Sequence, residues 1–395
     1  MKLIIFLLII VIALGFLNFF VYKLGNISGN ISANSLDKYA TGIVKKCSSA
    51  SYKPTCYEKE VPMLMDSISM EEAFQVTRII QDLDKSYQYC HVLGHELSAR
   101  ETAKDPGKWK DIIPRCPSGL CSNGCIHGAF QERFRAESLP GDEIERIKPE
   151  LKHICEPREN WDPTGLERGT CYHALGHLLM YITDADIYNS SKICEDVALD
   201  MNGRNWSPLC YDGVFMQLFQ PLEPDDFALI AGKEIKKNEL SSFCSKFTGE
   251  KRNSCWSEGW PLYRDDIMKP EGLVEFCSGK FVTDINDQRS CYLDLFYVLA
   301  AQFQFNIFRM RDFCEGLPNP WKNQCFANFA SRMIETDYRN IPTVIKWCSE
   351  VLSEDGKDTC FRELIFYSTY NFHAGSPEYS QLCNGLPEPW KKQCL

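Results

Sequence analysis

The sequence lacks several features by which common functions are recognised. It has no long run of lysine or arginine and its net charge is −10, so we do not expect a nucleic-acid partner, which requires a basic surface. It has no glycine-rich phosphate-binding loop and no Gly-x-Ser-x-Gly turn to present a nucleophilic serine. No two cysteines are spaced as Cys-x-x-Cys, and only seven residues are histidine. Clues to function must therefore come from other patterns, and cysteine and histidine carry the clearest ones.

The cysteine content indicates the compartment. The chain has 20 cysteines, an even number. Disulfides persist only in oxidising compartments, so a chain this rich in cysteine is expected outside the cytoplasm. Four Asn-x-Ser triplets, which are acceptors for N-linked glycans, agree with export and predict a glycoprotein. These triplets begin at Asn26, Asn30, Asn189 and Asn205.

The first residues predict a membrane anchor. Residues 3–22 form an uncharged, largely apolar segment, long enough to cross about 30 Å of hydrocarbon as one helix. No small-residue cleavage pattern follows, so we expect residues 1–23 to be an uncleaved signal-anchor rather than a signal peptide. Lys2 and Lys23 flank the span evenly, so the cysteines decide its orientation and place the body at the cell surface or in the periplasm. Residues 24–39, rich in Asn, Ser and Gly, are predicted to be a linker.

The cysteines recur in pairs along most of the chain. From Cys244 onward the first members of the pairs lie 33 to 37 residues apart, and a fixed period of this size, about 35, indicates a repeat array. The loops between paired cysteines contain glycine and proline, and apolar residues at helical spacing follow the second cysteine. Each repeat is therefore predicted to be two helices whose ends are joined by a disulfide. The predicted pairs are Cys47–Cys56, Cys155–Cys171, Cys194–Cys210, Cys244–Cys255, Cys277–Cys291, Cys314–Cys325, Cys348–Cys360 and Cys383–Cys394.

This period and this placement of cysteines resemble those of disulfide-linked αα-repeat proteins of the tetratricopeptide and Sel1-like type. We predict an all-α protein, in which the transmembrane helix is followed by disulfide-stapled helical hairpins in a solenoid-like body. Residues 40–240 hold duplicated units, and residues 241–395 form a more regular array whose surface suits a protein partner. Four further cysteines are expected to form two disulfides, with Cys116 to Cys125 as the closer analogue of the other loops, or else a thiolate metal cluster. These four are Cys90, Cys116, Cys121 and Cys125.

Five of the seven histidines fall into a duplicated pattern. His91-Val-Leu-Gly-His95 and His173-Ala-Leu-Gly-His177 share one motif, and two histidines at i and i+4 project from one face of a helix, where both can reach one metal ion. A second shared motif, Cys-x-(His or Asp)-Gly-x-Phe, follows each pair and supplies one more metal-ligand type. The sequence thus offers two sets of ligands, which are His91, His95 and His127 in the first unit and His173, His177 and Asp212 in the second.

Three nitrogen or oxygen ligands leave one coordination position open, as in catalytic rather than structural sites. Imidazole suits several transition metals, of which copper and zinc are our expectation, with haem ligated by histidine as an alternative. The two units either hold one ion each or face one another and hold a pair. Two other hypotheses are an enzyme that uses histidine as acid or base without metal, and a non-catalytic scaffold that binds protein or glycan partners while its histidines are structural.

Overall fold

The computed structural model describes residues 33–134, 138–222, 224–280, 285–351 and 353–394. Over these residues the chain is helical, with no β-strand and only isolated β-bridges. The prediction of an all-α body is therefore confirmed. The helices of the first half are α2 (Ala33–Cys47), α3 (Lys53–Met63), α4 (Met70–Leu83), α5 (His91–Lys104), α6 (Trp109–Ile112), α7 (Gly124–Phe134), α8 (Gly141–His153), α9 (Gly165–Ile182), α10 (Ile187–Val197), α11 (Ser207–Phe219) and α12 (Pro224–Leu229).

The second half begins with short helices and continues with longer hairpins. A π-helical stretch covers Glu275–Lys280, before the first long helix of this half. The helices are α13 (Leu240–Cys244), α14 (Glu250–Glu258), α15 (Arg264–Ile267), α16 (Pro270–Val274), α17 (Ile285–Gln302), α18 (Ile307–Glu315), α19 (Trp321–Thr336), α20 (Ile341–Ser349), α21 (Glu354–Asn371), α22 (Pro377–Gly385) and α23 (Lys391–Cys394).

The N-terminal predictions meet the structure only in part. The predicted membrane span at residues 3–22 lies outside the described residues, and none of the described helices has both the length and the apolar character needed to cross a bilayer. The predicted linker at residues 24–39 is wrong over its last part, because α2 already begins at Ala33. Its Asn- and Ser-rich composition conceals an apolar stripe at helical spacing, and that stripe is buried in the body. The stripe includes Leu36, Ala40 and Ile43.

The disulfides join the ends of consecutive helices as predicted. All eight predicted pairs form. In the hairpin of α18 and α19, for example, Cys314 near the end of one helix is bonded to Cys325 in the first turns of the next. The remaining four cysteines pair as Cys116–Cys125 and Cys90–Cys121. Because no cysteine in the described part of the chain is free, the alternative of a thiolate metal cluster is wrong.

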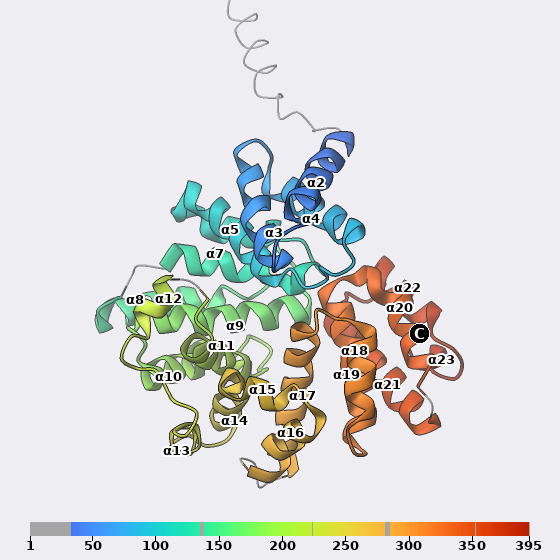
Figure 1. Ribbon diagram of the computed structural model, residues 1–395. Coiled ribbons are helices and arrows are strands. Elements are labelled where there is room, and N and C mark those ends of the chain that lie inside the picture. Colours follow the sequence, from blue (N-terminus) through green and yellow to red (C-terminus); the bar gives the residue numbers. More distant parts are fainter. Residues whose placement is uncertain (1–32, 135–137, 223, 281–284, 352, 395) are drawn as a thin grey trace, which may run out of the picture.

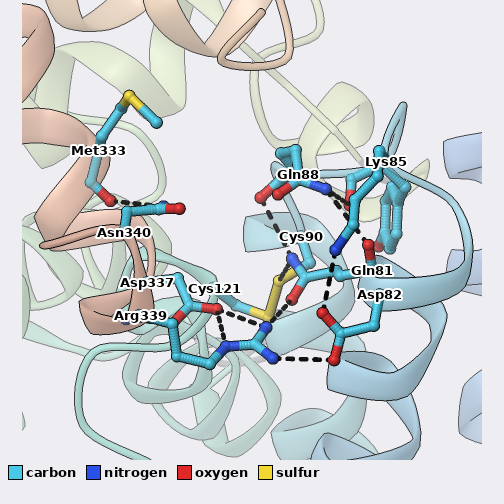
Figure 2. A network of polar contacts seen from close by, with 11 residues as sticks. Gln81, Asp82, Lys85, Gln88, Cys90, Cys121, Met333, Asp337, Arg339 and Asn340 are labelled. Atoms are coloured by element: carbon cyan, nitrogen blue, oxygen red, sulfur yellow. Dashed lines mark hydrogen bonds and ion pairs between the residues drawn. A yellow bond between two sulfur atoms is a disulfide. The ribbon is translucent and has the colours of Figure 1, made fainter. Parts of the chain in front are cut away.

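The helices do not form an open solenoid, because the array returns to its own beginning (Figure 1). Helices α2–α5 lie at the top of the view, α7–α17 follow around one side and below, and α18–α23 come back up toward α4. The Tyr338 amide donates to the Gly119 carbonyl at 3.3 Å, and the Arg339 guanidinium contacts Asp82 at 3.1 Å (Figure 2). An open array would leave the faces of its terminal hairpins exposed, whereas here one continuous apolar core extends from Leu36 to Cys394.

Candidate metal centre

Two pairs of helices with very close backbones carry the histidines. Helix α5 packs against α7, and α9 packs against α11, the two largest interhelical contacts among the described residues. A Cβ at Gly94 of α5 would lie 3.0 Å from the Cys125 amide nitrogen, and one at Gly128 of α7 would collide with the His95 carbonyl. Gly176 of α9 meets the Cys210 carbonyl of α11 in the same way. Glycine is required at these crossings because any side chain would separate the helices that bring the imidazoles together.

The loop that leads into α7 is strained and doubly tethered. Cys121–Asn123 are three consecutive non-glycine residues in the left-handed region, with φ of 53°, 48° and 55°, and this conformation costs roughly 1–2 kcal/mol per residue. The Cys90–Cys121 disulfide ties the loop to the start of α5, and Cys116–Cys125 ties the segment before it to the first turn of α7. The two disulfides hold a backbone that the local sequence would not adopt by itself, and strain of this kind is common near functional sites.

The first three predicted ligands converge on one point. One ring nitrogen from each of His91, His95 and His127 lies within 4.8 Å of the other two. His95 Nε2 is 3.1 Å from His91 Nε2 and 3.1 Å from His127 Nδ1. A tetrahedral ion with metal–nitrogen bonds of 2.0–2.1 Å would hold its ligand nitrogens roughly 3.3–3.4 Å apart. The trio is therefore almost at the spacing that one transition-metal ion requires, and it leaves no room for a porphyrin plane between the rings.

Hydrogen bonds on the outer side of the rings decide which nitrogens carry lone pairs. His91 Nδ1 lies 3.3 Å from the Cys121 carbonyl, which can only accept, so Nδ1 carries the hydrogen and Nε2 a lone pair. The side chain of Gln131 accepts a hydrogen bond from His95, whose Nε2 already faces the other imidazoles. The two Nε2 lone pairs of His91 and His95 thus face one another at 3.1 Å. A metal ion bound by both nitrogens would remove the repulsion between these two lone pairs.

Protonation does not supply that cation at neutral pH. The three side chains are buried, with 7%, 6% and 5% exposure for His91, His95 and His127. Burial lowers the pKa of His91 to about 4. Burial, with the neighbouring imidazoles, holds the pKa values of His95 and His127 well below the usual range. All three are therefore neutral at pH 7, which is the form that binds metal.

The second pair of histidines joins the same cluster. His173 Nε2 and His177 Nε2 are 3.1 Å apart. The ring of His127 stacks on that of His173 with a centroid separation of 5.0 Å, and it lies 5.6 Å from that of His177. These separations are close to the 4.7–4.9 Å within the first trio. The two sequence units therefore face one another, and five imidazoles form one continuous group.

A buried carboxylate from a short helix supports both units, and the sequence analysis missed it. Asp226 of α12 is 2% exposed, and its Oδ1 accepts from Gln217 Nε2 at 2.9 Å and from Gln131 Nε2 at 3.4 Å. The Gln217 carbonyl oxygen is 2.7 Å from His177 Nδ1, so that nitrogen carries the hydrogen and Nε2 again holds a lone pair. Gln131 makes the corresponding bond to His95. Such outer partners orient metal-binding histidines and strengthen them as ligands.

Asp212, the last predicted ligand, does not join the imidazoles. Gly213 of α11 contacts the His173 carbonyl, and in the first unit the equivalent contact with the His91 carbonyl is made by Gly124. By its place in the shared motif, however, Gly213 corresponds to Gly128, which lies one helical turn after Gly124. Helix α11 is thus displaced by one turn relative to α7, and Asp212 falls one turn short of the place of His127. Its carboxyl instead bonds Ser254 of α14 and interacts with two further acidic side chains, Glu258 and Asp294. Among the described residues, only the first trio forms a compact group of potential ligands.

The two histidines outside the duplicated pattern, His153 and His373, are exposed. Comparison of the chain with protein-family models, with curated proteins and with solved structures gives no match. Proposals about function must therefore rest on the site itself.

Proposed function

We propose that this chain is a membrane-anchored, extracytoplasmic metalloprotein that binds a transition metal, copper or zinc, through His91, His95 and His127. The observation that carries the proposal is the convergence of these nitrogens within 4.8 Å, with the lone pairs of His91 and His95 facing each other at 3.1 Å. A purely structural set of buried imidazoles would alternate N–H donors with lone-pair acceptors. Here the outer hydrogen bonds of His91 and His95 prevent that alternation between these two rings.

The donor set narrows the choice of metal. Every cysteine of the described chain is in a disulfide, so thiolate-dependent clusters have no ligands here. Neutral imidazoles suit copper and zinc better than calcium or magnesium, which prefer oxygen. Three protein ligands leave a coordination position for water or a substrate, as in catalytic zinc sites, so a Lewis-acid or redox reaction at this position is the chemistry that we propose to search for.

The proposed cellular compartment is inferred from the cysteine content and not from the metal site. Ten disulfides support an oxidising compartment. The anchor at residues 3–22, the glycans and a protein partner on the repeat surface remain proposals beside it.

Elemental mass spectrometry tests the proposed function. The full-length chain is purified in detergent after export into an oxidising compartment, and bound copper, zinc and iron are measured per mole of protein. We expect at least one equivalent of copper or zinc in the unaltered chain and in His153→Ala, an exposed control, and a loss of that equivalent in the double variant His91→Ala/His95→Ala. A folded, disulfide-intact chain that takes up neither metal on titration would contradict the proposal and leave the scaffold hypothesis.

A further inference from the structure

The ring of His91 is supported on one face by a tyrosine that precedes α5. The rings of Tyr89 and His91 are stacked, with centroids 5.8 Å apart and an interplanar angle of 12°, which is within the range of attractive aromatic pairs. Tyr89 also contacts the ring of Phe305, just after α17, at 5.9 Å. Its hydroxyl bonds the hydroxyl of Tyr297 on α17. The face of a candidate metal ligand is therefore supported from the second half of the chain.

The loop at the edge of the His91 ring is tied to the same tyrosine of α17. The Cys121 carbonyl accepts from His91 Nδ1, and the next residue, Ser122, is in the left-handed region with a φ of 48°. The Ser122 side chain bonds the Tyr297 hydroxyl and lies 3.2 Å from the Thr336 hydroxyl of α19. Two side chains from the second half of the chain thus hold a backbone conformation that is unfavourable by itself.

A carbonyl at the far end fixes the direction of these hydrogen bonds. The Thr336 hydroxyl lies 2.9 Å from the Arg332 carbonyl, which can only accept. Because a hydroxyl has one hydrogen, Thr336 must accept from Ser122, and Ser122 must in turn accept from Tyr297. The Tyr297 oxygen then accepts from Tyr89. The hydroxyls form one directed line, from the ring that stacks on the histidine to the backbone of α19, and the loss of any one of them breaks it.

The ring of Tyr297 is fixed as well as its hydroxyl. The Arg332 guanidinium lies over this ring, 5.2 Å from its centroid, and donates to Glu335 at 2.5 Å. Glu335 is buried, so the guanidinium is held in place on its other side. Tyr367 of α21 contacts the same guanidinium at 5.9 Å but has no place in the line of hydroxyls. These two half-buried tyrosines therefore differ in the feature that concerns the histidine.

We infer that Tyr297 is a positioning residue of the metal centre. Through Tyr89 it fixes the plane of the His91 ring. Through Ser122 it holds the carbonyl that keeps a hydrogen on His91 Nδ1 and leaves Nε2 available to a metal ion. Outer partners of this kind determine how strongly a histidine binds metal. The inference rests on the proposed function and adds that metal binding in the first half of the chain depends on α17 and α19 in the second half.

Copper affinity tests this role. The full-length chain in detergent is stripped with a chelator, checked for intact disulfides and fold, and titrated with Cu²⁺ against a competing chelator. Tyr297→Phe removes only the hydroxyl, and we expect an affinity lower by at least about tenfold and a changed copper hyperfine splitting in electron paramagnetic resonance. Tyr367→Phe, the matched control, removes a hydroxyl beside the same guanidinium and should change neither. Thr336→Val breaks the line at its far end and should act in the same direction as Tyr297→Phe.

Nuclear magnetic resonance of the metal-free chain separates this inference from the proposed function. With isotopic nitrogen in the histidines, the spectrum reports which ring nitrogen carries the hydrogen, and the His91 signals are identified by their loss in His91→Gln. We expect the hydrogen on Nδ1 in the unaltered chain and in Tyr367→Phe, and a mixture of the two tautomers in Tyr297→Phe. A tyrosine that only stabilised the fold would leave this distribution unchanged.

Each outcome decides one of the two claims. A chain that binds no copper contradicts the proposed function, and the tautomer comparison then still tests the inference. Equal copper affinity in Tyr297→Phe and Tyr367→Phe overturns the role of Tyr297, and so does an unchanged His91 tautomer in metal-free Tyr297→Phe. If Tyr297→Phe does not fold, Thr336→Val takes its place in both comparisons, and its equality with Tyr367→Phe overturns the inference.

Discussion

His177 donates a hydrogen bond from Nδ1 to the Gln217 carbonyl oxygen at 2.7 Å. Gln217 in turn donates from its amide nitrogen to Asp226 at 2.9 Å, so a carboxylate two hydrogen bonds away from the imidazole determines which ring nitrogen carries a lone pair. The histidine alone would be free to flip or to exchange tautomers. The chain from carboxylate to amide to imidazole thus prepares Nε2 for a cation.

Replacing Gln217 should weaken metal binding without removing a ligand. Gln217→Met keeps the length of the side chain and removes the hydrogen bonds, and loss of an outer partner of this kind typically lowers metal affinity about 10–100-fold. Competition with a chelator of known affinity measures the change. Gln220→Met is the matched control. Gln220 is the residue at the end of the same helix, α11, but it donates to Glu258 at 2.5 Å rather than contacting a histidine. Equal affinity in the two variants would show that Gln217 does not support the site.

Asp226→Asn should affect both groups of histidines. The substitution keeps the shape but removes a buried charge whose oxygens accept from Gln131, Gln217, Tyr181 and the Leu222 amide. Hydrogen bonds to charged groups contribute about 1.5–3 kcal/mol, so we expect the metal-free protein to lose stability of that order. Chemical denaturation measures that loss, and chelator competition should show weaker binding at every site the chain has. Unchanged metal affinity would confine Asp226 to a structural role.

Removing the Cys90–Cys121 disulfide at the start of α5 should lower metal affinity in addition to lowering the stability of the fold. Cys121 provides the carbonyl that accepts from His91 and begins the left-handed segment, and its disulfide closes a sequence separation of 31. Cys90→Ser/Cys121→Ser should cost about 3–4 kcal/mol in the chain-entropy model and also lower metal affinity. Cys383→Ser/Cys394→Ser, at a separation of 11, should cost about 3 kcal/mol and leave the affinity unchanged. Chelator competition and denaturation on both variants separate the two effects.

The acidic group around Asp212 predicts a loss of stability at alkaline pH. Burial raises the pKa of Asp212 to about 6, and burial together with the charges of Asp212 and the exposed Asp294 raises the pKa of Glu258 well above its usual range. Asp212 and Glu258 bind protons more tightly in the folded state, so their contribution to stability is present at acidic pH and is lost as pH rises from about 4 through 6 and above. Glu258→Gln should therefore raise the melting temperature at pH 8 by a few degrees and change it little at pH 5.

Glu271→Gln, an exposed substitution, is the control for that experiment and should show no difference between the two pH values. A melting temperature of Glu258→Gln that falls at pH 8 would contradict the assignment of these three carboxyls to one repelling group.

Local pattern was enough to predict much of the architecture. The regular spacing of cysteines gave their partners within each hairpin, because a short glycine- and proline-containing loop leaves the two helix ends close together. The i, i+4 histidines of each unit were also recognisable, since that spacing places both rings on one helix face. The apolar stripe of α2 was overlooked because polar residues dominate the composition of the segment.

The missing parts of the site depend on distant packing. The meeting of His127 with His173 and His177 follows from α7 packing on α9, which no local pattern encodes. The one-turn displacement of α11 separates Asp212 from the place that its motif predicts, because matching motifs do not ensure equal packing registers. Gln131 and Gln217 do leave a signal, since each follows the shared Gly-x-Phe motif by one or two residues. Asp226 leaves none, because its short helix has no counterpart in the first unit.

Extended X-ray absorption fine structure of the bound metal most directly tests the claim that histidines bind a metal ion in this protein. With a full complement of metal, the full-length chain should show a first shell of nitrogen at about 2.0–2.1 Å, with the outer-shell scattering of several imidazole rings and no sulfur. The imidazole contribution should fall in His95→Ala and persist in His153→Ala. A sulfur shell at about 2.3 Å, or a shell of oxygen without imidazole scattering, would contradict a histidine-bound metal centre in this protein.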